Sequence, residues 1–75
     1  MIDFVEDEFV QVLAKAPDKY GPGLVGIAIS IAKCVHEDTV ASTGIPIGDL
    51  VIWVGLDRGN GVEAIVIPSE WLVPL

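Results

Sequence analysis

Two runs of β-branched and aromatic residues lie on either side of one turn segment. The runs are residues 49–56 (DLVIWVGL) and residues 62–67 (VEAIVI). The segment between them, 57–61 (DRGNG), contains three consecutive residues that tolerate positive φ angles, which favours a β-hairpin. Leu50 and Ile52 alternate with Val51 and Trp53, so both faces of the first run are apolar. The sequence therefore predicts a central hairpin whose first strand is buried on most of its area.

A second strand is predicted over residues 24–35, where large and small side chains alternate. The alternating pairs are Val25-Gly26, Ile27-Ala28, Ile29-Ser30 and Ile31-Ala32. A period of two is typical of a strand, and the density of β-branched residues disfavours a helix. We expect the large residues to face the core and the small ones to face outward.

Residues 3–16 fit two different structures. Asp3 and Glu6 fit a helical capping box, and several apolar residues fall on one face of a helix. Those residues are Val5, Phe9, Val12, Leu13 and Ala16. The alternative is a strand over 9–14 that follows an acidic lead-in. Local pattern slightly favours the helix, whereas the pattern of the whole chain favours the strand, and both remain open.

Length, charge and cysteine content limit the classes of protein to which the chain can belong. Seventy-five residues form one domain, 1–75, in which residues 1–8 are an acidic lead-in. Eleven acidic residues against four basic ones give a net charge of −7, which argues against nucleic-acid binding and permits a basic protein partner. One cysteine forms no internal disulfide, and no apolar run is long enough to span a membrane. We therefore expect a cytoplasmic protein that does not bind membranes.

Three features together resemble an SH3-like small β-barrel. Residues 64–75 (AIVIPSEWLVPL) resemble a strand, a 3₁₀ turn with an aromatic residue, and a short closing strand. Residues 9–13 (FVQVL) and 22–29 (PGLVGIAI) resemble the first strand, a loop and a glycine-bearing second strand. The third feature is Gly48-Asp49 before the central hairpin. The resemblance implies a mainly β fold, a five-stranded SH3-like barrel with a short helix or 3₁₀ turn. The expected strands are 9–14, 24–35, 49–56, 62–67 and 72–74.

Acidic SH3-like barrels of this size are also similar to immunity proteins of bacterial toxin systems. That similarity lies in size, fold pattern and charge. The aromatic residues that line the peptide groove of eukaryotic SH3 domains are largely missing here. The resemblance therefore implies inhibition of a protein partner and does not imply recognition of proline-rich peptides.

Cys34 and His36 are the residues best suited to catalysis or metal binding. On a strand, a spacing of two would place both on one face. Two ligands are too few for a structural zinc site, so we interpret them as a semi-buried cysteine and a surface histidine. Glu37 and Asp38 are expected to begin a polar turn. We expect a non-enzymatic protein with no metal and no cofactor, and an enzyme that uses Cys34 and His36 is a third alternative.

The predicted function is that of an acidic inhibitor or immunity-type protein that neutralises a larger, basic, nuclease-like protein. Opposite charges speed the encounter of such partners. Trp71, next to Glu70 on a turn, is preferred as the interface anchor over Trp53, which we expect to be packed. The predicted partner-binding residues are Asp3, Glu6, Asp7, Glu8, Glu37, Asp38, Glu70 and Trp71.

A different function follows from the apolar content of 52 % in so short a chain. The alternative is a small structural or assembly subunit, for example one encoded by a phage, that forms a homo-oligomer through its apolar surface. The loop residues Ile45, Pro46 and Ile47 have no evident burial partner in the sequence, and such a surface patch would mark a contact site.

Overall fold

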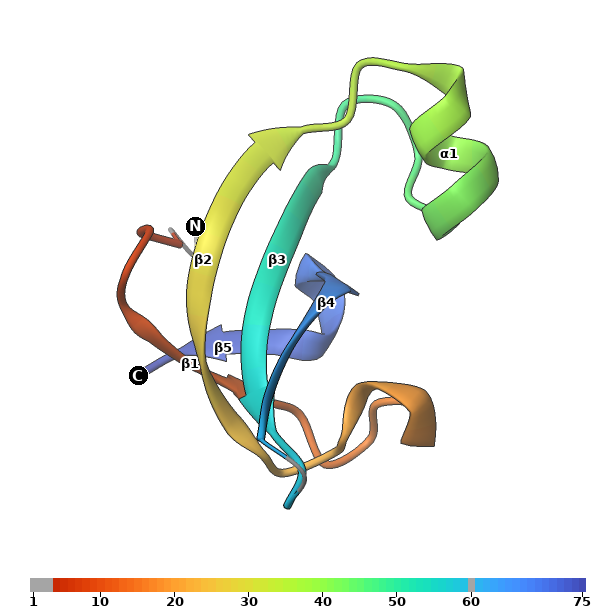
Figure 1. Ribbon diagram of the computed structural model, residues 1–75. Helices are drawn as coiled ribbons and strands as arrows, with labels where there is room; N and C mark the ends of the chain where they lie inside the picture. Colours follow the sequence, from red (N-terminus) through yellow and green to blue (C-terminus); the bar gives the residue numbers. More distant parts are fainter. Residues whose placement is uncertain (1–3, 60) are drawn as a thin grey trace.

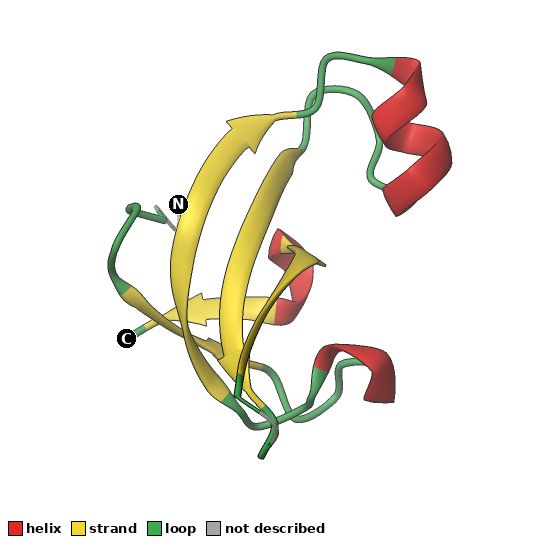
Figure 2. Ribbon diagram, viewed as in Figure 1, coloured by secondary structure: helices red, strands yellow, loops and turns green. Residues whose placement is uncertain are grey.

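Five strands and three short helical segments make up the computed structural model, which describes residues 4–59 and 61–75 (Figures 1 and 2). In chain order the elements are β1 (Phe9–Val12), η1 (Asp18–Tyr20), β2 (Val25–Lys33), α1 (Glu37–Thr43), β3 (Leu50–Asp57), β4 (Val62–Pro68), η2 (Ser69–Trp71) and β5 (Leu72–Pro74). Here α1 is an α-helix, and η1 and η2 are 3₁₀ turns. The predicted mainly β class is confirmed, and each strand lies within two residues of its expected ends.

All the strands belong to one antiparallel sheet, in the order β4-β3-β2-β1-β5. Strand β1 pairs with both β2 and β5, so the two ends of the chain meet inside the sheet. In the part of the chain that the structure describes, β4 and β5 are the two outer strands and do not pair with each other. The sheet is therefore open and strongly curved, and it does not close into the predicted barrel. After β4, η2 turns the chain so that β5 pairs with β1 and not with β4.

The strand alternative for the N-terminal region is correct. Val10 pairs with Gly26 on one side and Pro74 on the other, and such pairing outweighs a local helical pattern. A turn precedes the strand, and in it Asp7 has a positive φ of 68°. Asp3, which the capping box requires, lies outside the described residues. The strand ends at Val12, two residues earlier than expected.

The main core lies between the inner face of the sheet and the segments that cross it. From β3, Ile52, Val54 and Leu56 are fully buried, as the alternation in residues 49–56 predicts. The other buried members are Val10, Val12, Ala16, Ala28, Ile67 and Leu72. Residues from β1 and β5 thus complete a core whose centre is β3.

Strand β2 presents its small residues to this core, which reverses the predicted orientation. Ala28 is fully buried, whereas Val25 and Ile27 are exposed. A Cβ atom on Gly26 would lie 2.5 Å from the backbone oxygen of Gly55, closer than real Cβ atoms approach. The inner face of β2 therefore has no room for large side chains, because β3 packs tightly against it.

A β-bulge then changes which side chains of β2 face inward. The register with β3 shifts between Ala28 and Ser30, so Ile29 is an extra residue. Ile29 stays exposed, whereas Ile31 pairs with Ile52 and packs against the main core. A strict period of two cannot describe both halves of this strand.

Helix α1 begins where the sequence predicted only a polar turn. His36 is its N-cap residue, and Glu37 and Asp38 occupy the first turn, where the helix dipole favours acids. Gly44 ends the helix with a φ of 76°, in the left-handed conformation typical of a C-terminal glycine. These signals are present in the sequence, but a seven-residue helix that contains valine and threonine has low intrinsic propensity.

The central hairpin and the C-terminal 3₁₀ turn are confirmed. Asp57 pairs with Val62, and the amide of Gly59 donates a 2.8 Å hydrogen bond to the Asp57 side chain. Asn60, at the centre of the expected turn, lies outside the described residues. Over the described ranges, no helix is both long enough and apolar enough to cross a membrane.

Candidate functional site

The structure does not gather the predicted partner-binding acids into one patch. Glu6, Asp7 and Glu8 lie in the turn before β1, whereas Glu37 and Asp38 lie in the first turn of α1. These two elements are far apart in Figure 1. Glu70 lies on η2, a third location, and Asp3 falls outside the described residues. All the described acids of this set are exposed, so they form separate charged regions on the surface.

The two tryptophans have the opposite exposure to that expected. Trp71 is partly buried and packs against the main core. Trp53 lies on the outer face of β3 and keeps 44 % of its surface exposed. Trp71 therefore anchors η2 to the core, and Trp53 offers the larger contact surface to a partner.

The strongest candidate site is a group of large apolar side chains on the outer face of the sheet. Their exposed fractions run from 40 % at Ile27 to 77 % at Val62. We call this group the outer patch; it consists of Phe9, Val25, Ile27, Ile29, Trp53 and Val62. The sequence prediction placed none of these six residues in the site, because it turned β2 the wrong way, expected Trp53 to be packed, and did not assign Phe9 or Val62 to a surface. The signal that could have identified them is the small pair Gly26 and Ala28, which fits close packing against β3.

Strand pairing makes the outer patch continuous. Phe9 pairs directly with Ile27, and Ile27 pairs with Gly55, so these three residues share one row across the sheet. A Cβ atom on Gly55 would lie 3.1 Å from Ile29 and 3.3 Å from Val62. Ile29 and Val62 therefore lie over Gly55, and the patch spans β1 to β4 without a polar interruption at this row.

Acidic residues border the outer patch at the bulge of β2. The backbone amide of Asp7 donates a 2.8 Å hydrogen bond to the oxygen of Ala28, and a side-chain oxygen of Glu6 accepts one of 3.3 Å from Ile31. The acidic turn is therefore fixed beside Ile29. Three of the predicted partner-binding residues, Glu6, Asp7 and Glu8, thus adjoin apolar residues that the sequence did not assign to the site.

Cys34 and His36 do not form a joint site. Strand β2 ends at Lys33, so the expected alternation does not extend to them. The Cys34 thiol is buried beside Ile45 and lies 3.5 Å from its backbone oxygen. The His36 side chain is exposed at the start of α1. The predicted surface histidine is confirmed, whereas Cys34 is fully buried rather than semi-buried and belongs to a second small core with Ile45 and Val51.

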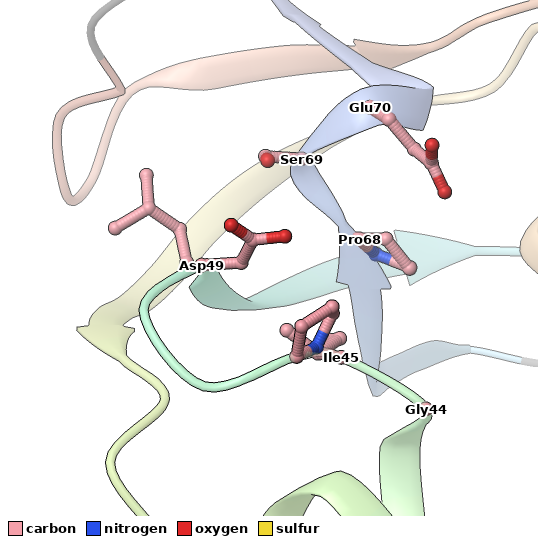
Figure 3. Close-up of a pocket in the computed structure, with 8 residues that line it drawn as sticks. Gly44, Ile45, Asp49, Pro68, Ser69 and Glu70 are labelled. Atoms are coloured by element: carbon pink, nitrogen blue, oxygen red, sulfur yellow. The ribbon is translucent and has the colours of Figure 1, made fainter.

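A hollow of about 260 Å³ lies between the loop after α1 and η2. Figure 3 shows the carboxylates of Asp49 and Glu70 on opposite sides of Pro68 within it. Both acids are exposed to water, whereas paired catalytic carboxylates need different environments to take different roles. The predicted apolar loop is divided here, because Ile45 is buried and Ile47 is exposed. The hollow therefore offers no assignable chemistry.

Nothing in the described ranges brings three histidine, cysteine or acidic residues together as a metal site. Comparison of the chain with protein-family models, with curated proteins and with solved structures found no match. The resemblance to SH3-like immunity proteins stays a prediction, and function has to be inferred from the surface itself.

Proposed function

We propose that the chain is a non-enzymatic protein-binding module that contacts its partner through the outer patch. The observation that supports this most directly is the reversed orientation of β2, which places Val25, Ile27 and Ile29 in solvent. Large apolar residues that adjoin on a surface are typical of interaction sites. Trp53 and Phe9 add aromatic side chains, which often provide much of the binding energy at an interface.

The partner that fits best is a larger basic protein, of the kind that an acidic inhibitor neutralises. A net charge of −7 attracts a basic surface from a distance and raises the association rate. The acids next to the bulge, Glu6 and Glu8, then lie at the rim of the contact, where charges affect the rate more than the affinity. A nuclease-like toxin is one such partner.

The test of the outer patch is capture of binding partners with matched lysine substitutions. Ile29→Lys places a charge inside the patch, and Ile47→Lys places one on an equally apolar and exposed residue outside it. We expect the first variant to lose its partner and the second to retain it. Equal capture by both variants would show that the outer patch is not the contact surface.

The test of the electrostatic component compares two pairs of acids. Reversing Glu6 and Glu8 to lysine changes charges beside the patch, whereas reversing Glu37 and Asp38 changes charges on α1. With the captured partner, we expect the first pair to slow association more than the second, and the difference to shrink at high salt. If neither reversal changes the association rate, the proposal of a basic partner is wrong.

A homo-oligomeric assembly subunit remains the second candidate, because the same apolar face could bind another copy. Light scattering distinguishes the two functions, since a stable ring or dimer that Ile29→Lys dissociates would favour assembly. A monomer that Ile29→Lys leaves unchanged would favour the inhibitor.

A further inference from the structure

Strand β4 presents a free edge to solvent. The amide and the carbonyl of Ala28 both bond to the segment that leads into β1, so they point away from β3. Val54, the partner of Ala28 in β3, therefore directs its own amide and carbonyl toward β4, where they meet those of Ile65. Because backbone groups alternate in direction along a strand, the amides and carbonyls of Ala64 and Val66 point outward. Across the described ranges, no backbone or side-chain group bonds to these outward-facing groups.

The other edge of the sheet is protected, which makes the β4 edge unusual. Strand β5 has three residues and ends in Pro74, and short strands and proline are devices that block pairing at an edge. Strand β4 has seven residues and places its proline only at the end, at Pro68. Its single charged residue is Glu63. The chain thus protects one edge and leaves the longer one available.

A hollow of about 450 Å³ adjoins this edge, and Glu63, Ile65 and Val66 of β4 contribute to its lining. Its floor includes Ile65 and Val66, which lie on opposite faces of β4. Figure 1 shows α1 beyond the C-terminal end of β4, and η1, coloured orange, to one side at the level of its start. These two elements contribute the remaining walls with Trp53 and the turn of the hairpin; the wall residues are Lys19, Tyr20, Ser42, Thr43, Trp53 and Arg58.

The hollow is the basic part of an acidic protein. Two of the chain's four basic residues, Lys19 and Arg58, line it, and Glu63 is the one acid in the lining. The Arg58 guanidinium donates a hydrogen bond to the backbone oxygen of Lys19, which holds the two residues together. Both adjoin the start of β4, so an acidic group is favoured at that end of the edge.

We infer that the β4 edge accepts an extended peptide strand from a partner protein, with acidic residues at the end next to Lys19 and Arg58. The strand would run antiparallel to β4, as every pair in this sheet does, so its C-terminal end carries the acids. Its backbone pairs with Ala64 and Val66. Its alternate side chains contact Tyr20 and Ile65 on one face and Trp53 and Val66 on the other.

A peptide strand fits this edge better than a second copy of the chain. A second copy brings another net charge of −7 to the contact, whereas a peptide brings only its own acids to a locally basic hollow. The site differs from the outer patch, with which it shares Trp53. A protein that covers Trp53 on the outer patch would therefore compete with the peptide, whereas one that leaves Trp53 free would not.

The probe is a synthetic peptide of eight residues, N-acetylated, with alternating valine and threonine followed by two C-terminal aspartates. Titration of the protein with this peptide is followed by NMR, together with hydrogen exchange of the Ala64 and Val66 amides. We expect saturable binding that slows exchange at these two amides. A peptide N-methylated at alternate amides cannot form the ladder, and we expect it to bind at least about tenfold more weakly.

The matched variants change the edge and the charge separately. Ala64→Pro removes an amide that bonds nothing in the described chain and should abolish peptide binding, whereas Ala64→Thr keeps the amide and should bind normally. Lys19→Gln should weaken binding of the aspartate peptide about two- to fivefold and should not weaken binding of a variant peptide with C-terminal lysines. The N-methylated peptide tests the same ladder with an unaltered protein, should the proline variant fail to fold.

Several outcomes would overturn the inference. One is equal binding of the plain and N-methylated peptides; another is saturable binding without protection of the Ala64 and Val66 amides, or no binding at millimolar peptide. Protection of these amides without peptide, in a dimer seen by light scattering, would assign the edge to a second copy. Ile29→Lys should retain peptide binding, so failure of the outer-patch proposal does not affect this test.

Discussion

The two faces of β2 differ in a way that sequence periodicity does not reveal. The inner face carries Gly26 and Ala28, both buried, whereas the outer face carries Val25, Ile27 and Ile29, all exposed. A hydrophobicity rule would assign the larger residues to the core. In the structure the available room determines which face of β2 is buried, because β3 lies so close to the inner face that only small side chains fit there.

This difference also separates residues that stabilise the fold from residues that are free to bind. The core side chains are supplied by the neighbours of β2, chiefly β1 and β3, so the β2 inner face serves as a close-packed wall. Its large outward residues are not required for core packing. Side chains that are apolar, exposed and not needed for stability are the expected composition of a binding surface.

The largest expected effect comes from the core that the inner face covers. Leu56→Ala should lower the free energy of unfolding by about 2–5 kcal/mol, because it removes a fully buried side chain and leaves a cavity. Val25→Thr, on the outer face, keeps the β-branched shape and should change stability by less than about 0.5 kcal/mol. Urea denaturation of both variants measures the contrast. Similar losses would mean that the two faces are not energetically distinct.

The second expected effect tests the close approach directly with two strand glycines. Gly26→Ala should cost about 1–3 kcal/mol, because its Cβ would clash with the backbone oxygen of Gly55. In Gly55→Ala the new Cβ atom meets the exposed side chains of Ile29 and Val62, which can move aside, so the loss of stability should be near zero. Thermal unfolding of the pair is the measurement, and a cost for Gly55→Ala equal to that for Gly26→Ala would contradict the assignment of the faces.

Much of the fold could be predicted because the strands and turns carry strong local signals. Residues 49–56 and 62–67 have β-branched content and a glycine-rich turn between them, and the hairpin forms there as expected. The 3₁₀ turn at η2 agrees with the resemblance of residues 64–75 to the end of an SH3-like barrel. The missing helix, α1, has weak propensity and gains stability from packing on Val51 and Cys34, which local pattern does not report.

The candidate site was harder to predict because it depends on the bulge and on strand contact. The alternation from Val25 to Ile31 indicates two faces, but only pairing with β3 decides which one is buried. The bulge at Ile29 then breaks the alternation, so Ile31 faces inward although Ile29 does not. The sequence identifies the acidic residues but not their neighbours in space. Glu6 adjoins the outer patch because its side chain accepts a hydrogen bond from the backbone of Ile31.

Two neighbouring positions on the outer face of β3 differ in how they are covered. Val51 is covered by Cys34 and Ile45 next to α1, whereas Trp53 is exposed. Val51→Ala removes about two buried methylene equivalents and should cost about 1.6 kcal/mol. Guanidinium denaturation measures the loss, with Ile47→Ala as an exposed control from the same loop region. A cost below that of the control would mean that α1 covers the sheet only loosely.

The smallest effect on stability should come with the largest effect on recognition. Ile29→Thr keeps β-branching at the bulge, and exposed substitutions of this kind usually change stability by less than about 0.5 kcal/mol. The same change removes apolar surface from the centre of the outer patch, so partner capture or self-association should fall. Ile29 is the extra residue of the bulge and has no register partner in β3, and it lies over Gly55, which has no side chain whose packing would be lost. If Ile29→Thr destabilises the fold by as much as Val51→Ala, the outer patch has a structural role, and the separation between the two faces of β2 is wrong.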